Sequence, residues 1–343
     1  MRVAMYYSNK DIRLEEMPKP KLGPGEVLVK VMASGICGSD LMEWYRKDKV
    51  PLVLGHEIAG EIVEVGEGVD KYKIGDRVAA THHVPCNTCY YCKRGNHTAC
   101  ETLQRHTRFY PGGFAEYVRL PPINVDKGVF PIPDGISFEE ATFAEPLGCV
   151  VRGQKKARLQ PDQSVFVVGC GISGLLHVKL ASASGAGRVM AADTIDYRLK
   201  AAKRFGADSV INAEGDVPAA LREVNDGRLA DLVIICRGAF IPQALKSVEK
   251  SGTVLFFAGA KEGVTIPYTI NELFWRTEVT LTSSYAAAPE DCIEALEFIR
   301  TGRVNVRDMI THRFGLGDTV KGFYLVSHPW EHQSIKVIIE PQR

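Results

Sequence analysis

The order of apolar and polar residues divides the chain into two parts with different periodicities. Val27, Val29 and Val31 alternate with other residues over 26–32, and residues 57–65 show a similar pattern, which indicates half-buried β-strands. Glycine and proline recur at short intervals throughout 18–78, and turn signals over 66–78 lead into a third strand. The first part therefore predicts an antiparallel β domain whose loops carry function.

The second part alternates strand-like and helical segments. Residues 164–168 are a short apolar run typical of a buried parallel strand, and a glycine-rich turn, a helical stretch and a strand over 188–193 follow. Further segments of both kinds lie at 208–212, 218–225, 231–236, 241–248, 252–259 and 278–284. This alternation of strands and helices predicts an open parallel sheet. A helix is expected over 289–302, and we expect the strands of 303–343 to rejoin the first domain.

Length and charge narrow the functional classes. A chain of 343 residues is expected to form two domains, and a formal net charge of +1 argues against an extended nucleic-acid-binding surface. The first residues lack the apolar region of a signal peptide, and no apolar stretch approaches the ~20 residues that a membrane span needs. We therefore expect a cytoplasmic protein with no nucleic-acid or membrane partner.

Four of the nine cysteines crowd into one short lobe, at Cys86, Cys89, Cys92 and Cys100. Their spacing matches a closed tetrahedral zinc site with four thiolate ligands. An iron–sulfur cluster is the alternative, because CxxCxxC also opens ferredoxin motifs. Those motifs continue with CxxxCP, however, and no proline follows Cys100. The spacing favours a structural zinc ion with no open coordination position.

A second set of possible metal ligands is spread along the chain. Cys37 lies in ASGICGSD (33–40), His56 and Glu57 end VLGHE (53–57), and Glu145 precedes a proline in ATFAEPLGCV (141–150). Thiolate, imidazole and carboxylate ligands with one open position suit a catalytic zinc ion. Each residue also has a structural interpretation: a buried cysteine, a hydrogen-bonded histidine, or a carboxylate at a helix end.

The strand over 164–168 is followed at once by GCGISG, which comprises Gly169, Gly171 and Gly174 with Ile172 and Ser173 between the last two. The next strand ends at Asp193, nineteen residues after Gly174. This order is typical of a dinucleotide-binding unit, in which the pyrophosphate lies at the helix N-terminus. Asp193 would bind the adenosine ribose and repel a 2′-phosphate, which favours NAD over NADP. Arg198 would lie across the adenine, or is simply an exposed helical arginine.

Together these motifs resemble those of the zinc-dependent medium-chain alcohol and polyol dehydrogenases, in the sorbitol and threonine dehydrogenase branch. The resemblance spans essentially the whole chain and rests on ASGICGSD, GHEIAGEIVEVGEGV, the four-cysteine lobe, GGFAEYV, EPLG, and GCGISG with Asp193. It implies an α/β protein with a GroES-like, β-rich catalytic domain and a Rossmann domain with a doubly wound parallel sheet. The catalytic domain would comprise residues 1–148 and 290–343 with the zinc lobe at 86–100, and the Rossmann domain residues 149–289.

The resemblance also implies roles for individual residues. Cys37, His56 and Glu145 would bind the catalytic zinc, while Glu57 would bind or leave the metal during turnover. Ser39 would accept or relay the substrate's hydroxyl proton as hydride passes to NAD. The nicotinamide half of NAD would contact Ala258, Gly259, Ser283 and Ser284. Two zinc ions per subunit are implied, as is a homo-tetramer, with a dimer as the alternative.

Three features depart from the family pattern. Met42 and Glu43 stand where many members have a proton-relay histidine, which leaves Glu43, Glu57 or water to carry the proton outward. Ser284 stands where sorbitol dehydrogenases tend to have a substrate-contacting arginine. The segments 44–50 and 103–111 are basic and aromatic. Their charges are either solvated or bind an anionic substrate group, with these candidates: Arg46, Lys47, Arg105, His106 and Arg108.

The sequence therefore predicts an NAD-dependent zinc dehydrogenase that acts on a small-molecule secondary alcohol, or on its ketone in reverse. The expected substrate is a polyol, cyclitol, sugar or hydroxy-amino acid. A dehydrogenase of simple alcohols or of a phosphorylated or otherwise anionic sugar alcohol is the alternative. A catalytically silent sensor of NAD and zinc is disfavoured, because the ligands and Ser39 are present together. Zinc-free quinone reductases would need neither the ligand set nor the cysteine lobe.

Overall fold

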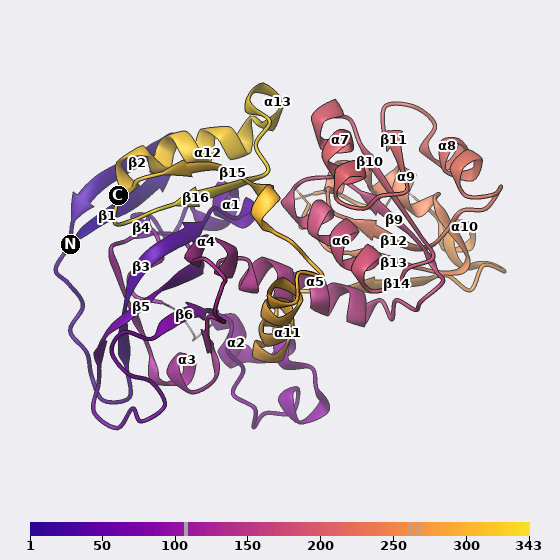
Figure 1. The fold of residues 1–343 in the computed structure, drawn as a ribbon. Helices are drawn as coiled ribbons and strands as arrows, with labels where there is room; N and C mark the ends of the chain where they lie inside the picture. Colours follow the sequence, from indigo (N-terminus) through magenta and orange to yellow (C-terminus); the bar gives the residue numbers. More distant parts are fainter. Residues whose placement is uncertain (106–108, 261–262, 267) are drawn as a thin grey trace. The chain divides into compact units, whose positions relative to one another are not determined.

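The computed structural model describes residues 1–105, 109–260, 263–266 and 268–343. Contacts within the chain divide it into two compact units. Unit 1 comprises Met1–Gly148 and Ala286–Arg343, and unit 2 comprises Cys149–Tyr285. Both units are visible in Figure 1. None of the helices in the described residues is both long and apolar enough to span a membrane.

The strands of unit 1 form a three-stranded sheet, in the order β2-β1-β4, and a seven-stranded sheet. The larger sheet has the order β15-β16-β3-β5-β6-β8, with β7 paired to β3. The strands are β1 (Arg2–Ser8), β2 (Asp11–Glu16), β3 (Val27–Gly35), β4 (Leu52–Val53), β5 (Glu57–Val65), β6 (Arg77–Ala80), β7 (Tyr117–Leu120), β8 (Val129–Pro131), β15 (Ile310–Phe314) and β16 (Lys336–Ile339).

The predicted strands at 57–65 and around 26–32 are confirmed as β5 and β3, which pair antiparallel. Their alternating apolar residues, including Val29 and Ile62, are buried in one core. The antiparallel pairing predicted for the first part is confirmed, since β5 also pairs antiparallel with β6, whereas β15 and β16, from the carboxyl-terminal segment, run parallel. A parallel pair needs a crossover connection, and helix α12 (Thr319–Ser327) lies between these strands in the chain and packs on β16.

Unit 1 also has short helices between its strands. The α-helices are α1 (Glu43–Arg46), α2 (Glu101–Arg105), α3 (Pro122–Lys127), α4 (Phe138–Ala141), α11 (Pro289–Arg300), α12 and α13 (Pro329–His332). Ser137 caps α4, and its hydroxyl accepts a hydrogen bond from the Glu140 amide. Helix α5 (Ala144–Lys156) follows, so Glu145 lies in its first turn.

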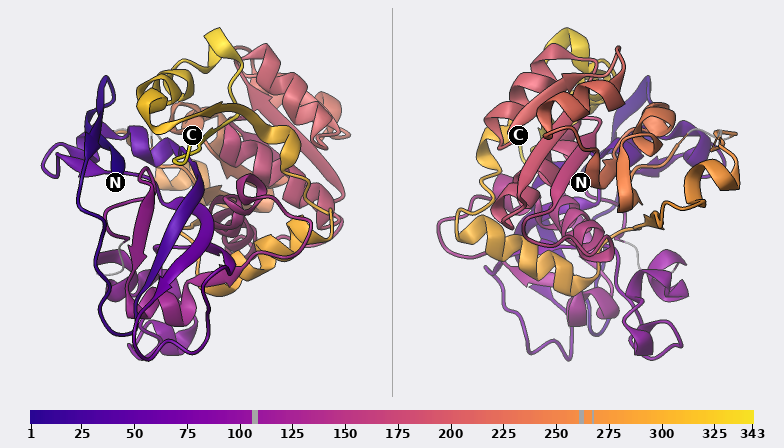
Figure 2. Two further views of the ribbon diagram at one scale, coloured as in Figure 1. Left: turned by 60° about the vertical axis from the view of Figure 1, so that its left-hand side comes forward. Right: turned by 90° about the vertical axis from the view of Figure 1, so that its right-hand side faces the viewer.

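Unit 2 is built on a six-stranded parallel sheet with the order β11-β10-β9-β12-β13-β14. Helices α6 and α7 pack together on one side of it, and α8 and α9 pack together on the other (Figures 1 and 2). The elements are β9 (Ser164–Val168), α6 (Ile172–Ala183), β10 (Arg188–Asp193), α7 (Asp196–Arg204), β11 (Ser209–Asn212), α8 (Val217–Val224), β12 (Ala230–Ile235), α9 (Ile241–Leu245), β13 (Val248–Phe256), α10 (Ile270–Phe274) and β14 (Thr280–Ser283).

The predicted doubly wound sheet is confirmed, and β9 and β10 have their predicted bounds. All five residues of β9 are buried, which explains its unbroken apolar sequence. The helix predicted over 241–248 is shorter, because Val248 already pairs with Ala230 of β12.

Candidate active site and cofactor site

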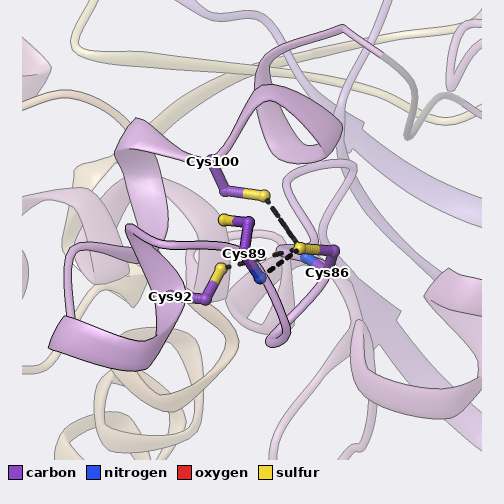
Figure 3. A group of neighbouring side chains, drawn as sticks. All are labelled: Cys86, Cys89, Cys92 and Cys100. Carbon is purple, nitrogen blue, oxygen red and sulfur yellow. Dashed lines mark hydrogen bonds between the residues drawn. The ribbon is translucent and has the colours of Figure 1, made fainter.

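The four cysteines of the lobe point toward one another (Figure 3). The Sγ of Cys86 lies 3.6 Å from that of Cys100 and 4.0 Å from that of Cys92, and the four sulfurs all lie within 4.8 Å of one another. Tetrahedral zinc with Zn–S bonds of about 2.3 Å holds its sulfurs about 3.8 Å apart. The lobe therefore fits one zinc ion. An iron–sulfur cluster fits less well, because it spreads its thiolates over several irons.

The lobe favours the thiolate form that zinc requires at Cys86, but not at Cys92. The Thr88 hydroxyl and the backbone amides of Thr88 and Cys89 lower the pKa of the Cys86 thiol to about 5. Without an ion, burial and the neighbouring sulfurs of Cys89 and Cys100 raise the pKa of Cys92 to about 12. A bound cation would remove the repulsion between these thiolates.

Cys37, His56 and Glu57 form a second group of donors, whose ligand atoms all lie within 4.8 Å of one another. Cys37 follows the end of β3 and caps a short 3₁₀ turn (Gly38–Leu41). His56 immediately precedes β5, and Glu57 is the first residue of that strand. Because β3 and β5 pair antiparallel, with Gly35 opposite Glu57, their register brings these donors together. A thiolate, an imidazole and a carboxylate suit zinc.

Asp40 is an outer partner of two residues in this group, Cys37 and His56. Its carboxylate is fully buried; Oδ2 accepts a hydrogen bond of 3.0 Å from the Cys37 amide, and Oδ1 lies 3.5 Å from His56 Nδ1. Burial lowers the pKa of His56, but Asp40 and the Cys37 thiolate raise it well above its usual value. Asp40 therefore orients the imidazole through Nδ1 and leaves Nε2 for a metal.

Glu57 is buried and forms an ion pair with the buried ammonium of Lys336, in β16. The same ammonium donates to the Ile36 carbonyl over 3.2 Å. Burial raises the pKa of Glu57 despite this partner, and the nearby Glu145 carboxylate raises it further. A metal ion at this group would compete with Lys336 for the Glu57 carboxylate, which fits a residue that binds or leaves the metal.

Glu145 lies beside a histidine pair that the sequence analysis did not single out. Its Oε1 is 3.7 Å from His83 Nδ1, and the ligand atoms of His82, His83 and Glu145 lie within 4.8 Å of one another. The rings of His82 and His56 are 4.8 Å apart, so the two groups are neighbours. The structure does not place Glu145 in the group with Cys37 and His56, and its role as their third ligand stays a prediction. Two consecutive histidines shortly after β6 were the available signal.

The residues proposed for proton transfer lie in different parts of unit 1. The Ser39 hydroxyl donates to Cys37 Sγ over 3.3 Å and so lies at the metal group. Glu43 is exposed, and its Oε1 accepts a hydrogen bond of 2.8 Å from the amide of Asn9, in the turn between β1 and β2. Glu43 is thus held toward that turn, which makes it a weaker candidate than Glu57 for the proton's exit.

The basic residues proposed to bind an anionic substrate group also differ in exposure and contacts. Arg46 is turned inward and its guanidinium contacts Asp40, whereas Lys47 is exposed. Arg105 is exposed and lies 3.3 Å from Glu101, one helical turn earlier. The other two candidates, His106 and Arg108, lie outside the described residues.

In unit 2, the glycine motif forms a tight turn between β9 and α6. Gly169 has φ +98°, and a Cβ on Gly174 would lie 1.9 Å from the Gly169 carbonyl oxygen. Gly171 begins α6 with no side-chain cap, and Ile172 and Ser173 form its first turn. The helix amides are therefore available to a pyrophosphate, and the turn fits a dinucleotide.

Asp193 ends β10 and is fully buried. Its Oδ2 accepts 2.7 Å from the amide of Cys170 and its Oδ1 accepts 3.0 Å from the amide of Ile195. Arg198 Nη1 lies 3.9 Å from Oδ2, and the guanidinium is within 4.0 Å of where a Gly171 Cβ would be. Asp193 thus fixes the glycine turn, and Arg198 covers it. The carboxylate's predicted contact with the ribose stays a prediction.

The remaining cofactor candidates lie at the same edge of the sheet. Ala258 and Gly259 follow β13, while Ser283 ends β14 and Ser284 follows it. Parallel strands bring these residues to the carboxyl-terminal edge, where the glycine motif and Asp193 also lie. Arg237, which follows β12, was not predicted, although its Cβ lies 2.9 Å from where a Gly169 Cβ would be. Its place directly after a buried strand was the available signal.

Comparisons with known proteins match both halves of the chain. The alcohol dehydrogenase GroES-like domain matches residues 23–134, and the zinc-binding dehydrogenase domain matches residues 173–301. The chain belongs to the zinc-dependent medium-chain alcohol and polyol dehydrogenases. It is an NAD-dependent, zinc-containing oxidoreductase of polyols and related hydroxy compounds, as predicted.

Individual relatives of this dehydrogenase cover nearly its whole length. Sorbitol dehydrogenase of Bacillus subtilis is 32% identical over 100% of this chain and 98% of its own. L-threonine 3-dehydrogenase of Pyrococcus horikoshii is 35% identical over 88% of this chain and 87% of its own. The structure of galactitol-1-phosphate dehydrogenase from Escherichia coli superposes with a TM-score of 0.87 at 25% identity, over 99% of this chain and 100% of that one.

Proposed function

We propose that this dehydrogenase oxidises a secondary alcohol of a polyol, cyclitol, sugar or hydroxy-amino acid at the group formed by Cys37, His56 and Glu57. The observation that carries the proposal is the convergence of these three donors from two paired strands, within 4.8 Å of one another. Sorbitol, threonine and xylulose are named among the substrates of its relatives, which supports this class. Unit 1 would be the catalytic domain and unit 2 the NAD-binding domain.

In this mechanism Cys37 and His56 would hold the catalytic zinc, and Glu57 or Glu145 would supply a carboxylate ligand. When bound, zinc stabilises the alkoxide form of the substrate, and NAD accepts the hydride. The Ser39 hydroxyl lies 3.3 Å from the Cys37 sulfur and would take the proton from the substrate's hydroxyl. Asp40 holds His56 in the orientation that ligation needs.

Polar side chains near this group favour a polyhydroxylated substrate over a simple alcohol. His82 and His83 are partly exposed; their ring centroids are 3.6 Å apart with the planes tilted by 39°, and the His82 ring lies 4.8 Å from that of His56. Such groups lose hydrogen bonds when an aliphatic alcohol displaces their water, whereas additional hydroxyls replace those bonds. A hydrophobic pocket would be needed for a preference for ethanol-like or benzylic alcohols.

A substrate panel followed by NADH absorbance tests this proposal. It should contain polyols, cyclitols, sugars, sugar phosphates, hydroxy acids, threonine and simple alcohols, each with NAD and with NADP. Cys37→Ser should abolish turnover and remove one of two zinc ions, while the control Cys149→Ser, outside both metal groups, keeps both ions and the activity. Turnover that survives in Cys37→Ser without its zinc, or preference for simple alcohols, would contradict the proposal.

We further propose a cytoplasmic homo-oligomer, a tetramer with a dimer as the alternative. Apolar side chains are exposed around α10, notably Ile270 at 72% and Trp275 at 67%. They lie in the segment before β14, which is the edge strand of its sheet. A second subunit would cover this surface and pair with the edge. Trp275→Glu should reduce the mass measured by light scattering to that of a smaller species, and an unchanged mass would exclude this interface.

A further inference from the structure

We propose that Arg46 is a positioning residue of the metal site, which acts on His56 through Asp40. Arg46 is the last residue of the short helix α1. Only 13% of its side chain is exposed, whereas its neighbours Trp44 and Tyr45 are 51% and 50% exposed. An arginine on a short surface helix usually extends its guanidinium into water. Here the guanidinium is folded inward, toward the residues that follow Cys37.

Two contacts define this inward position. Arg46 Nη2 donates to the Ser39 carbonyl over 3.1 Å and lies 3.5 Å from Asp40 Oδ1. The same Oδ1 lies 3.5 Å from His56 Nδ1, and Oδ2 accepts from the Cys37 amide over 3.0 Å. One buried carboxylate is therefore surrounded by a cation, an imidazole and a backbone amide. Both proposed fixed zinc ligands, Cys37 and His56, depend on it for their placement.

The charges explain why Arg46 matters to the metal. A histidine that binds zinc must be neutral, so His56 then offers Asp40 a hydrogen bond without a full positive charge. A buried carboxylate without a cationic partner is costly. Arg46 is permanently charged and supplies that partner at Asp40 Oδ1. Its contact with Ser39 also fixes the turn that carries Cys37, so one guanidinium supports both ligands.

This role differs from the anion-binding role that the basic sequence around Arg46 suggested. Arg46 Nη2 is directed at Ser39 and Asp40, and only 13% of the side chain is exposed, so little of the guanidinium is accessible to a phosphate or carboxylate on the substrate. The adjacent Lys47 is exposed and has no such inward contact among the described hydrogen bonds and ion pairs. Lys47 is therefore the matched control, with the same charge on the same segment.

The test measures metal binding directly, which makes its outcome independent of the proposed substrate. Arg46→Gln, Arg46→Lys and Lys47→Gln are prepared as full-length protein, and Zn²⁺ and Co²⁺ affinities are measured by chelator competition. Removing a residue that supports a metal-binding side chain from the outer shell typically weakens metal binding 10–100-fold. We expect a loss of this size for Arg46→Gln, a smaller loss for Arg46→Lys, and none for Lys47→Gln. The four-cysteine site should keep its affinity in every variant.

Spectroscopy and kinetics distinguish an effect on the position of the metal ligands from a general loss of structure. In Arg46→Gln, the visible bands of Co²⁺ bound at Cys37 should shift, and kcat should fall with little change in KM for a neutral polyol. Unchanged affinity and bands, or a rise in KM confined to anionic substrates, would overturn the proposal. If Arg46→Gln fails to fold, Arg46→Lys decides: an intermediate affinity supports positioning, and wild-type affinity refutes it.

Discussion

His177 provides a pH-dependent test of the packing of unit 2. It lies on α6, the helix that begins at the glycine motif, and it is fully buried. Its Nδ1 is 3.3 Å from Gln154 Nε2, and its ring meets the Phe257 ring edge-on at 4.4 Å. Burial lowers the pKa of His177 to about 3 from its ordinary value of 6.5. The native state therefore keeps this imidazole neutral throughout the mildly acidic range.

The sign of the effect follows from which state binds the proton. The native pKa lies below the unfolded one, so as the pH falls below 6.5 the unfolded chain is protonated first and becomes favoured. Stability is complete above that pH and declines toward about pH 3. At 1.36 kcal/mol per pKa unit, the 1.5 units between 6.5 and pH 5.0 correspond to a loss of about 2 kcal/mol.

The assay compares wild type with His177→Leu in urea unfolding followed by far-UV circular dichroism, at pH 7.5 and pH 5.0. Between these values the free energy of unfolding of wild type should fall by about 2 kcal/mol more than that of the variant. Gln154 Nε2 also donates to the His177 backbone carbonyl over 2.9 Å, a contact that leucine keeps. His332→Gln, at an exposed histidine, is the control and should behave like wild type. Equal pH dependence in wild type and His177→Leu would refute the reasoning.

Three further predictions concern the metal and cofactor sites. Cys92→Ser should remove one zinc ion per chain and lower the melting temperature, because three thiolates cannot close the tetrahedral site; metal analysis that still finds two ions would contradict this. Lys336→Met should destabilise the protein by roughly 3–5 kcal/mol in urea unfolding, since it leaves Glu57 buried without its cation, and adding Glu57→Gln should restore most of the loss. Asp193→Ser should weaken NAD binding by about 1.5–3 kcal/mol, roughly 10–150-fold, and narrow the gap to NADP; an unchanged ratio of NAD to NADP affinity in fluorescence titration would refute the role of its charge.

Features built from residues close together in the chain were predictable from sequence. The four-cysteine lobe occupies fifteen residues, and its spacing alone indicated one tetrahedral ion. The bounds of β9 and β10 and the glycine turn between β9 and α6 also followed from local pattern. Hydrophobic periodicity and turn-forming residues act over a few positions, so both can be recognised in the sequence alone.

The environment of the second metal group was decided only by the tertiary structure. Glu57 and Lys336 are 279 residues apart, and nothing near either residue indicates that they form a buried ion pair. His83 meets Glu145 because β6 ends beside the first turn of α5, although neither segment carries a recognisable motif for that contact. Arg46 looked like a solvated or substrate-binding charge until its guanidinium was found against Asp40.

For this protein, the sequence by itself determined the two kinds of domain, the zinc lobe and the dinucleotide turn, because each is specified by local spacing. The tertiary structure decided which carboxylates, histidines and cations surround Cys37 and His56. Those partners lie in β5, α1, α5 and β16 and in the loop after β6, segments distant in sequence, and strand register and packing bring them together. Long-range charge pairing inside a protein depends on burial and distance, which are properties of the folded chain.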